Sequence, residues 1–241
     1  SLMERLFRYR FSSEGHLVGH SFGNLFIASM TEVLGDFEDA VRESSKVLAI
    51  RGQVLPATNE NIKLGARYAD DSIQIGESVI PRPAKKINQV FLQPSTCRAT
   101  HDAVTAIKKA EIIVIGPGSL FTSILPNLLV NGIASEIKKS NAIKIYVCNV
   151  MTQPGETDNY NVSDHVEAIE EHVGKGLFDY VIVNSEKGGE HLAQRYKEEG
   201  AFSVDVDKKI KNREDLKVIA ADLLTDRGYI RHDPDKLAEI I

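Results

Sequence analysis

The second half of the chain alternates between short apolar runs and stretches with helical spacing, and this alternation restricts the fold more than any other feature. The apolar runs lie at 111–116, 142–150, 180–185 and 202–206, with a fifth in the first half of 216–224. Helical patterns cover 101–110, 120–140 (with a break at Pro126), 163–174 and 190–200. Strands that are apolar at nearly every position are buried on both faces, as in a parallel sheet covered by helices. The pattern therefore predicts an α/β fold.

The stretch from about residue 50 to 93 has a different texture. Short alternating runs are interrupted there by Gly, Pro and the Asp70-Asp71 pair. Alternation indicates half-buried strands, and the Asp pair between two such runs predicts a hairpin. Before this stretch we expect helices, one closed by Gly35 and the next opened by Asp36 as N-cap. We therefore predict a single α/β domain over residues 1–241 with a β-rich insertion at about 50–93.

The composition is that of an ordinary soluble protein. Hydrophobic residues make up 42% of the 241 residues, charged residues make up 26%, and the formal net charge is −5. This balance gives no reason to expect nucleic acid or an anionic membrane as a partner. No segment approaches the roughly 18 apolar residues of a membrane span, and the N-terminus is unlike a secretory signal. We expect a cytoplasmic protein in which Cys97 and Cys148 are reduced thiols in or near the core.

The carboxyl ends of the predicted parallel strands are the natural place for a ligand. The run at 111–116 ends in Gly116, Pro117, Gly118 and Ser119. Glycines let the backbone turn sharply and let a ligand approach it closely, and the N–H groups at the start of the following helix suit a phosphate or carboxylate. A plain strand-to-helix turn with Ser119 as N-cap is the alternative. Ser119 lacks the G-x-S-x-G context of a nucleophile.

Polar residues follow the next two predicted strands as well. Asn149 is followed by Thr152, Gln153, Gly155, Glu156 and Thr157, and the strand at 180–185 ends near Asn184. Hydroxyl and amide groups of this kind can bind a base, a sugar or a phosphate. Glu156 and Asp158 could hold a hydrated Mg²⁺ beside a diphosphate. A solvated loop without a ligand remains the alternative for this segment.

A third candidate lies near the N-terminus. Residues 19–23 match G-x-S-x-G with Ser21 in the nucleophile position, but the buried strand that such an elbow requires does not precede them. A polar Gly loop before a helix favours instead a second anion contact, with His20 and Asn24 beside it. His20 as a general acid, or as a histidine with an ordinary hydrogen-bonding role, remains open.

Other residues carry weaker signals. Tyr196 can stack on a nucleobase and Arg231 can pair with a phosphate, although both residue types are common on surfaces. His165 and His172 are too far apart for a paired zinc site, and the sequence has no H-E-x-x-H or C-x-x-C motif. We therefore predict no tightly held metal.

Taken together, several segments resemble one family. The motifs are LFRYRF at 6–11, GHSFGNLFIASM at 19–30, RGQVLPAT at 51–58, VIGPGSLFTSILPNLLV at 114–130, IYVCNVMTQPGETDNY at 145–160 and GYIRHDP at 228–234. They are similar to the YvcK branch of the CofD-like family, the gluconeogenesis factors. The resemblance runs from about residue 2 to 240 and implies a Rossmann-like parallel sheet with helices on both faces.

The resemblance also implies a function. Members of this branch bind UDP-sugars and are linked to carbon metabolism, cell shape and peptidoglycan synthesis, without an established reaction. On this basis Tyr196 and Arg231 become nucleotide-sugar contacts, and 116–119 and 149–157 form the pocket floor. The alternatives are a CofD-like, Mg²⁺-dependent transferase that moves 2-phospholactate from a guanylylated donor to a deazaflavin precursor, and a scaffold that acts through protein partners or as a homo-oligomer. We expect binding rather than catalysis.

The chain departs from the family pattern at its beginning. Family members open with a strand and a Gly-rich loop, and then carry an Asp-Asp-Gly-Gly and a Pro-Pro-Gly-Asp segment; here the first glycines are Gly15 and Gly19. We therefore expect that the chain is a fragment or that residues are missing from it. The missing loop would be the natural diphosphate site of the family.

Overall fold

The computed structural model describes residues 2–12, 17–47, 52–82, 85–186, 188–225 and 230–241. The chain divides into two compact units. Unit 1 consists of residues 1–59 and 100–103, and unit 2 of residues 60–99 and 104–241.

Unit 1 is helical in its described part. It contains α1 (Leu2–Arg8), α2 (Phe22–Leu34), α3 (Phe37–Val47) and the beginning of α4 (His101–Lys109). The ring of Phe7 packs edge-on against Phe22 and Phe26, which joins α1 to α2. The predicted helix ends are confirmed: Gly35 closes α2 with φ +75°, and Asp36 Oδ1 accepts a hydrogen bond of 2.8 Å from the Asp39 N–H.

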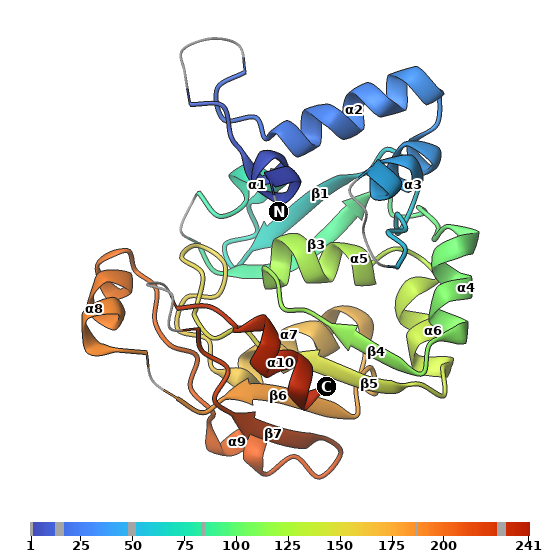
Figure 1. Cartoon of the computed structure of the whole chain (residues 1–241). Coiled ribbons are helices and arrows are strands. Elements are labelled where there is room, and N and C mark those ends of the chain that lie inside the picture. Colours follow the sequence, from blue (N-terminus) through green and yellow to red (C-terminus); the bar gives the residue numbers. More distant parts are fainter. Residues whose placement is uncertain (1, 13–16, 48–51, 83–84, 187, 226–229) are drawn as a thin grey trace. The chain divides into compact units, whose positions relative to one another are not determined.

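Unit 2 is built on a parallel sheet, as predicted. Its strands are β4 (Ile112–Ile115), β5 (Ile143–Val147), β6 (Tyr180–Asn184) and β7 (Lys217–Ala221), in the order β4-β5-β6-β7 (Figure 1). Ile145, Val147, Ile182 and Leu223 form a core on one face and pack against Leu237 and Ile240 of α10 (Pro234–Ile240). Side chains that alternate with these, including Tyr146 and Val181, are also fully buried. Burial on both faces explains the apolar character of the two central strands β5 and β6, whereas Ile112 and Val114 of the edge strand β4 are exposed within the described residues.

Helices and shorter turns connect the strands. They are η2 (Leu120–Ile124), a π-helical turn, followed by α5 (Leu125–Leu128), α6 (Ile133–Lys139), α7 (Val162–Val173), α8 (Glu190–Glu198) and α9 (Lys208–Lys211). The helical stretch changes from π-helical to α-helical between Ile124 and Leu125, next to the predicted break, and Pro126 lies in the first turn of α5. The stretch is interrupted again at Gly132, whose φ is +109°.

A second, antiparallel sheet confirms the β-rich insertion. Its strands β1 (Lys63–Tyr68), β2 (Ile73–Ile75) and β3 (Ile87–Gln93) have the order β2-β1-β3, and η1 (Glu77–Val79) follows β2. The predicted hairpin joins β1 to β2, with Asp71 at φ +62° and the Asp70 carboxylate accepting a hydrogen bond from the Ser72 N–H. Within the described residues 52–58, which the sequence pattern also suggested as β-rich, no strand forms.

One predicted strand of unit 2 is wrong. Residues 202–206 contribute only an isolated antiparallel bridge between Ser203 and Met151. The fourth strand of the sheet is β7, within the predicted run at 216–224. The described part of this segment therefore supports the loop after β5 rather than extending the sheet.

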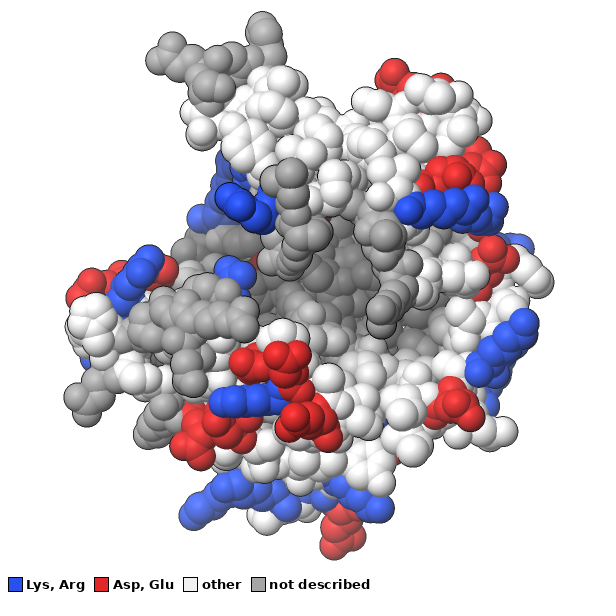
Figure 2. Space-filling model, viewed as in Figure 1, with Lys and Arg blue, Asp and Glu red and all other residues white. Residues whose placement is uncertain are grey.

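Other predictions concern the cysteines, the surface and the membrane. Cys97 and Cys148 are both free and buried, as expected. Basic and acidic side chains are interspersed on the face shown in Figure 2, and some are paired, such as Lys236 with Asp222 at 2.7 Å. None of the helices in the described part of the chain combines the length and hydrophobicity needed to cross a bilayer.

Candidate functional site

A cavity of about 550 Å³ lies in unit 2 beyond the carboxyl ends of β4 and β5. Four chain segments contribute to it: the turn after β4, the loop after β5, helix α8 and the segment before α10. Its lining residues are Pro117, Gly118, Ser119, Asn149, Val150, Met151, Thr152, Gln153, Tyr196, Ile230, Arg231 and His232. The structure thus brings together eight predicted contact residues: Pro117, Gly118, Ser119, Asn149, Thr152, Gln153, Tyr196 and Arg231. We call this cavity the strand-end pocket.

Gly116 shapes the turn at the tip of β4. Its φ is +83°, and a Cβ at this position would lie 2.9 Å from the carbonyl oxygen of Val147 in β5. A side chain here would therefore meet both an unfavourable backbone conformation and a backbone atom that cannot move away. Gly116 does not itself line the pocket; it lets the following residues turn into it.

A hydrogen-bonded polar network forms one side of the pocket. Gln153 Nε2 donates to Ser119 Oγ over 2.7 Å, and Asn149 Nδ2 donates to the Gly118 carbonyl oxygen over 3.0 Å. Asn149 Nδ2 also lies 3.5 Å from Gln153 Oε1. Ser119 occupies the N-cap position of the helix that follows, as the alternative prediction had it, but its side chain makes no capping hydrogen bond there. The network joins the loops after β4 and β5 instead.

The carboxylate of Glu156 lies at the start of the helix that follows Ser119 and accepts hydrogen bonds there. Glu156 Oε1 accepts a hydrogen bond of 3.0 Å from Thr122 Oγ1, and backbone hydrogen bonds of Phe121 and Thr122 also favour its charged form. Burial nevertheless raises the pKa of Glu156 above its ordinary value, and its Oε2 atom is enclosed without a partner among the described residues. Glu156 therefore lies at the helix start that the sequence suggested for an anion.

The other residues of the loop after β5 have structural contacts. The hydroxyl of Thr157 accepts a hydrogen bond of 2.9 Å from the Gln153 N–H, and that of Thr152 accepts one of 2.9 Å from the Phe202 N–H. Gly155 has φ +79°, and a Cβ there would lie 2.1 Å from the carbonyl oxygen of Pro81. Gly155 and Thr157 therefore hold the loop in shape and do not line the strand-end pocket.

Apolar side chains form another wall of the pocket. Ile230 is buried with Val150 and Met151, and Tyr196 packs against the same cluster. This packing fixes the aromatic ring beside the polar network. Sequence reasoning predicted Tyr196, but it missed the apolar residues because nothing in their local pattern distinguishes them from core residues.

His232 is the polar lining residue that sequence reasoning missed. Its Nε2 atom lies 3.1 Å from the carbonyl oxygen of Cys148, the residue directly after β5. Burial lowers the pKa of His232, so the neutral imidazole is favoured. Its place beside Arg231 in the motif at 228–234 was the signal that could have drawn attention to it.

Three further predicted contact residues lie away from the loops after β4 and β5. Asn184, at the end of β6, uses its amide inside the protein: Oδ1 accepts a hydrogen bond of 3.1 Å from the Leu223 N–H, and Nδ2 donates to the Glu186 carbonyl oxygen. His20 and Asn24 belong to unit 1. Ser21 caps α2 by accepting a hydrogen bond from the Asn24 N–H, so this N–H is not available to an anion.

Comparison with known proteins places this site in a family. The sequence model of the family described as 2-phospho-L-lactate transferase CofD matches residues 1–224. The chain belongs to the CofD family. This confirms the resemblance seen in the motifs, of which those at 114–130 and 145–160 carry most of the strand-end pocket.

Comparison with individual members of the CofD family shows which of them the chain is similar to. The chain is 45% identical over 241 residues to the "Gluconeogenesis factor" of Bacillus subtilis and 45% identical over 246 residues to that of Halalkalibacterium halodurans, and it spans 76% and 75% of those proteins. It spans 54% of a Clostridium acetobutylicum relative to which it is 44% identical. A crystal structure of a UPF0052 family member from Bacillus halodurans matches with a TM-score of 0.93 and 46% identity, covering 100% of this chain and 78% of that one.

An acidic cavity of about 470 Å³ lies beside the loop after β5 of this CofD-family chain. It is lined by Lys86, Glu156, Asp158, Asn159, Tyr160 and Asp164. Two of its carboxylates have partners within the loop: Asp158 Oδ2 accepts from the Gly155 N–H, and Asp164 Oδ2 accepts from the Asn161 N–H in a capping box. Within the described residues, no group of three or more His, Cys, Asp or Glu side chains is arranged to hold a metal ion.

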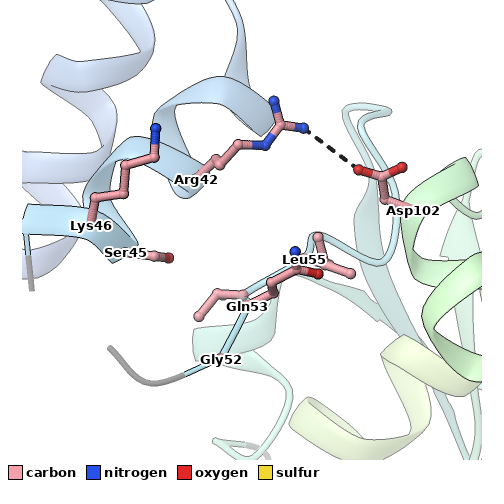
Figure 3. A pocket seen from close by; sticks show the side chains of 8 residues that line it. Arg42, Ser45, Lys46, Gly52, Gln53, Leu55 and Asp102 are labelled. Carbon is pink, nitrogen blue, oxygen red and sulfur yellow. Dashed lines mark ion pairs between the residues drawn. The ribbon is translucent and has the colours of Figure 1, made fainter. Parts of the chain in front are cut away.

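Unit 1 has a smaller cavity of about 260 Å³, shown in Figure 3. It is lined by Arg42, Ser45, Lys46, Gly52, Gln53, Val54, Leu55 and Asp102. The Arg42 guanidinium lies 3.6 Å from the Asp102 carboxylate and also pairs with Asp39, while Lys46 pairs with Glu43. Both cations that line it are matched by nearby carboxylates, so this cavity is a weaker candidate for an anionic ligand than the strand-end pocket.

Proposed function

We propose that the strand-end pocket binds a nucleotide sugar, with a UDP-sugar as its ligand. The observation that carries this proposal is the convergence of Asn149, Gln153, Tyr196 and Arg231 from separate segments on one cavity. Its volume of about 550 Å³ lies within the range of roughly 300–1,000 Å³ that small-molecule sites occupy. A polar network next to an aromatic wall suits a ligand that is part sugar and part base.

Each part of the ligand has a matching group in the pocket. The exposed Arg231 guanidinium supplies the charge and planar donors that pair with a diphosphate. The Tyr196 ring offers an aromatic surface on which a base can stack. The amides of Asn149 and Gln153 provide hydrogen-bonding groups for sugar hydroxyls. The turn after β4 contributes backbone close to the ligand through Gly118.

We propose further that this binding is regulatory. Two relatives that are 45% identical to the chain are named gluconeogenesis factors, a name that links this branch of the CofD family to carbon metabolism. A protein that senses a UDP-sugar in the cytoplasm would connect carbon metabolism with cell shape and peptidoglycan synthesis. The pocket also lacks an activated serine among its described residues, because Ser119 Oγ is paired with the Gln153 amide rather than with a base.

The second candidate is a CofD-like transferase. It is favoured by the match of residues 1–224 to the family described as 2-phospho-L-lactate transferase CofD. The residues present do not fit the Mg²⁺ of such an enzyme: Glu156 is occupied by Thr122 and has a raised pKa, and Asp158 is bound to the Gly155 N–H.

Isothermal titration of UDP-N-acetylglucosamine into the chain tests the proposal. We expect saturable binding that the Arg231→Ala and Tyr196→Ala substitutions each weaken about tenfold or more, as expected for a lost charged hydrogen bond or a lost stacking contact. Lys46→Ala in unit 1 is the control and should leave binding unchanged. The absence of heat with any UDP-sugar at millimolar concentration would contradict the proposal and leave the scaffold role, while turnover of a guanylylated donor would favour the transferase.

A further inference from the structure

We infer that His232 accepts a hydrogen bond from the bound ligand through Nδ1, and that the pocket thereby selects ligands with an N–H or O–H group at this place. The inference rests on the proposed ligand-binding function of the strand-end pocket. His232 lies within the motif at 228–234 but beyond residues 1–224, which the family model matches.

The hydrogen bond to Cys148 determines which nitrogen of the ring carries the proton. A backbone carbonyl oxygen can only accept, so His232 Nε2, which lies 3.1 Å from the Cys148 oxygen, must be the donor. In the neutral imidazole the other nitrogen, Nδ1, then has a lone pair and acts as an acceptor. Nδ1 has no partner within the described residues and is not sealed from solvent.

The backbone on both sides holds the ring in place. The Asp233 N–H donates to the Leu223 carbonyl oxygen over 2.7 Å, and the Thr225 N–H donates to the Arg231 carbonyl oxygen over 3.1 Å. Asp233 then caps α10 by accepting hydrogen bonds from the N–H groups of Asp235 and Lys236. A side chain held in this way is pre-organised, because little conformational freedom is lost when a ligand binds.

The surroundings favour the neutral ring. His232 is half-buried, and its pKa is lowered by that burial, with the Cys148 hydrogen bond as the opposing influence. The amide donors of Asn149 and Gln153 in the same pocket already point at protein acceptors, the Gly118 carbonyl and the Ser119 hydroxyl. His232 Nδ1 therefore offers the ligand an acceptor with no partner within the described residues, in addition to Asn149 Oδ1, to which no described group donates. The uracil N3–H and the sugar hydroxyls are the donors of a UDP-sugar that fit it.

Two substitutions at the same position separate this role from a structural one. In His232→Gln the side-chain amide can still donate to the Cys148 oxygen from the place of Nε2, but no acceptor remains at the place of Nδ1. In His232→Asn an amide oxygen can occupy the place of Nδ1, but the donor to Cys148 is lost. If His232 recognises the ligand, His232→Asn should bind it more tightly than His232→Gln. If His232 only anchors the chain through Cys148, the order of the two affinities should be reversed.

The experiment is titration of UDP-N-acetylglucosamine into the unsubstituted chain and both variants, with thermal unfolding of each as the folding control. We expect His232→Gln to bind about tenfold more weakly, the size of one lost hydrogen bond with its unsatisfied partner, and His232→Asn to bind more tightly than His232→Gln although it unfolds at a lower temperature. Affinity in His232→Gln that equals or exceeds that of His232→Asn would overturn the inference. No binding by the unsubstituted chain would instead overturn the proposed function itself.

Discussion

Gln153 Nε2 donates a hydrogen bond of 2.7 Å to Ser119 Oγ and so joins the loops after β4 and β5 across the floor of the strand-end pocket. The two residues are separated by 34 positions in the sequence, and each lies directly beyond a strand of the parallel sheet. The side chains that would contact a ligand are therefore held by one another before any ligand arrives. Pre-organisation of this kind raises affinity because less ordering remains to occur on binding.

Removal of either partner should weaken ligand binding without unfolding the chain. We expect Gln153→Ala and Ser119→Ala each to reduce the affinity for UDP-N-acetylglucosamine about three- to tenfold, since a net hydrogen bond is worth about 0.5–1.5 kcal/mol. The double variant should lose less affinity than the sum of the two, because both substitutions remove the same contact. Calorimetric titration of the four proteins measures this coupling. Strict additivity would show that the two side chains act independently.

The two glycines of the turn after β4 should respond differently to a methyl group. Gly116→Ala places a Cβ 2.9 Å from the Val147 carbonyl oxygen at φ +83°, whereas a Cβ on Gly118 meets only side-chain atoms of Ser123 and Ile124 at 3.6 Å, an ordinary contact distance. We expect Gly116→Ala to lower the free energy of unfolding by about 1–3 kcal/mol and Gly118→Ala to change it little. Urea denaturation of both variants tests this, and equal destabilisation would contradict the assignment of strain to Gly116.

The fold was largely predictable because local patterns determine much of it. The strands around Tyr146 and Val181 are apolar at most positions, a composition typical of strands buried on both faces. Helix ends followed from single residues, as at Gly35 and Asp36. The predicted strand at 202–206 failed because strand formation needs a neighbour, and Ser203 meets its partner Met151 at only one position.

The site was less predictable because its important contacts are long-range. The Glu156 carboxylate engages the helix start that the sequence assigned to a ligand, and its partner Thr122 lies 34 positions away. His232 meets the Cys148 carbonyl oxygen across 84 positions. Asn184 has the residue type and strand-end position of a ligand contact, yet its amide holds the protein backbone. Residue type and local position do not distinguish these outcomes.

A buried ion pair should contribute more to stability than an exposed one. Arg213 Nη1 and Nη2 donate to both carboxylate oxygens of Glu170 over 3.0 and 2.7 Å, and the exposed fraction of the Glu170 side chain is 6%. The Asp215 and Glu170 carboxylates raise the pKa of Arg213 further above its usual range. We expect Arg213→Met to lower the free energy of unfolding by about 3–5 kcal/mol, because a buried carboxylate is left without its partner.

The matched control for this prediction is the exposed pair of Lys46 and Glu43, whose side chains are 66% and 42% exposed. Lys46→Met should change the free energy of unfolding by less than about 1 kcal/mol. Chemical denaturation at neutral pH compares the two variants. A loss in Arg213→Met no larger than that in Lys46→Met would show that Glu170 finds water or another partner when Arg213 is removed.

His172 should make the stability of unit 2 depend on pH in the weakly acidic range. Its Nε2 accepts a hydrogen bond of 2.9 Å from the Val90 N–H of β3, and its Nδ1 lies 2.6 Å from the Ala168 carbonyl oxygen, so the folded protein holds the neutral ring. Burial lowers the pKa of His172 from its ordinary value of 6.5. Below that value the unfolded chain binds a proton that the folded protein does not, and stability therefore falls as the pH falls.

The size and origin of this effect can be measured by unfolding between pH 7.5 and 5. One such histidine contributes a loss of up to about 1.4 kcal/mol per pH unit. We expect His172→Gln, whose amide oxygen can still accept the Val90 hydrogen bond, to have a shallower pH dependence than the unsubstituted chain, with the remaining slope due to His165 and His232, whose pKa values burial also lowers. Identical slopes in the unsubstituted chain and His172→Gln would show that His172 keeps its ordinary titration in the folded protein.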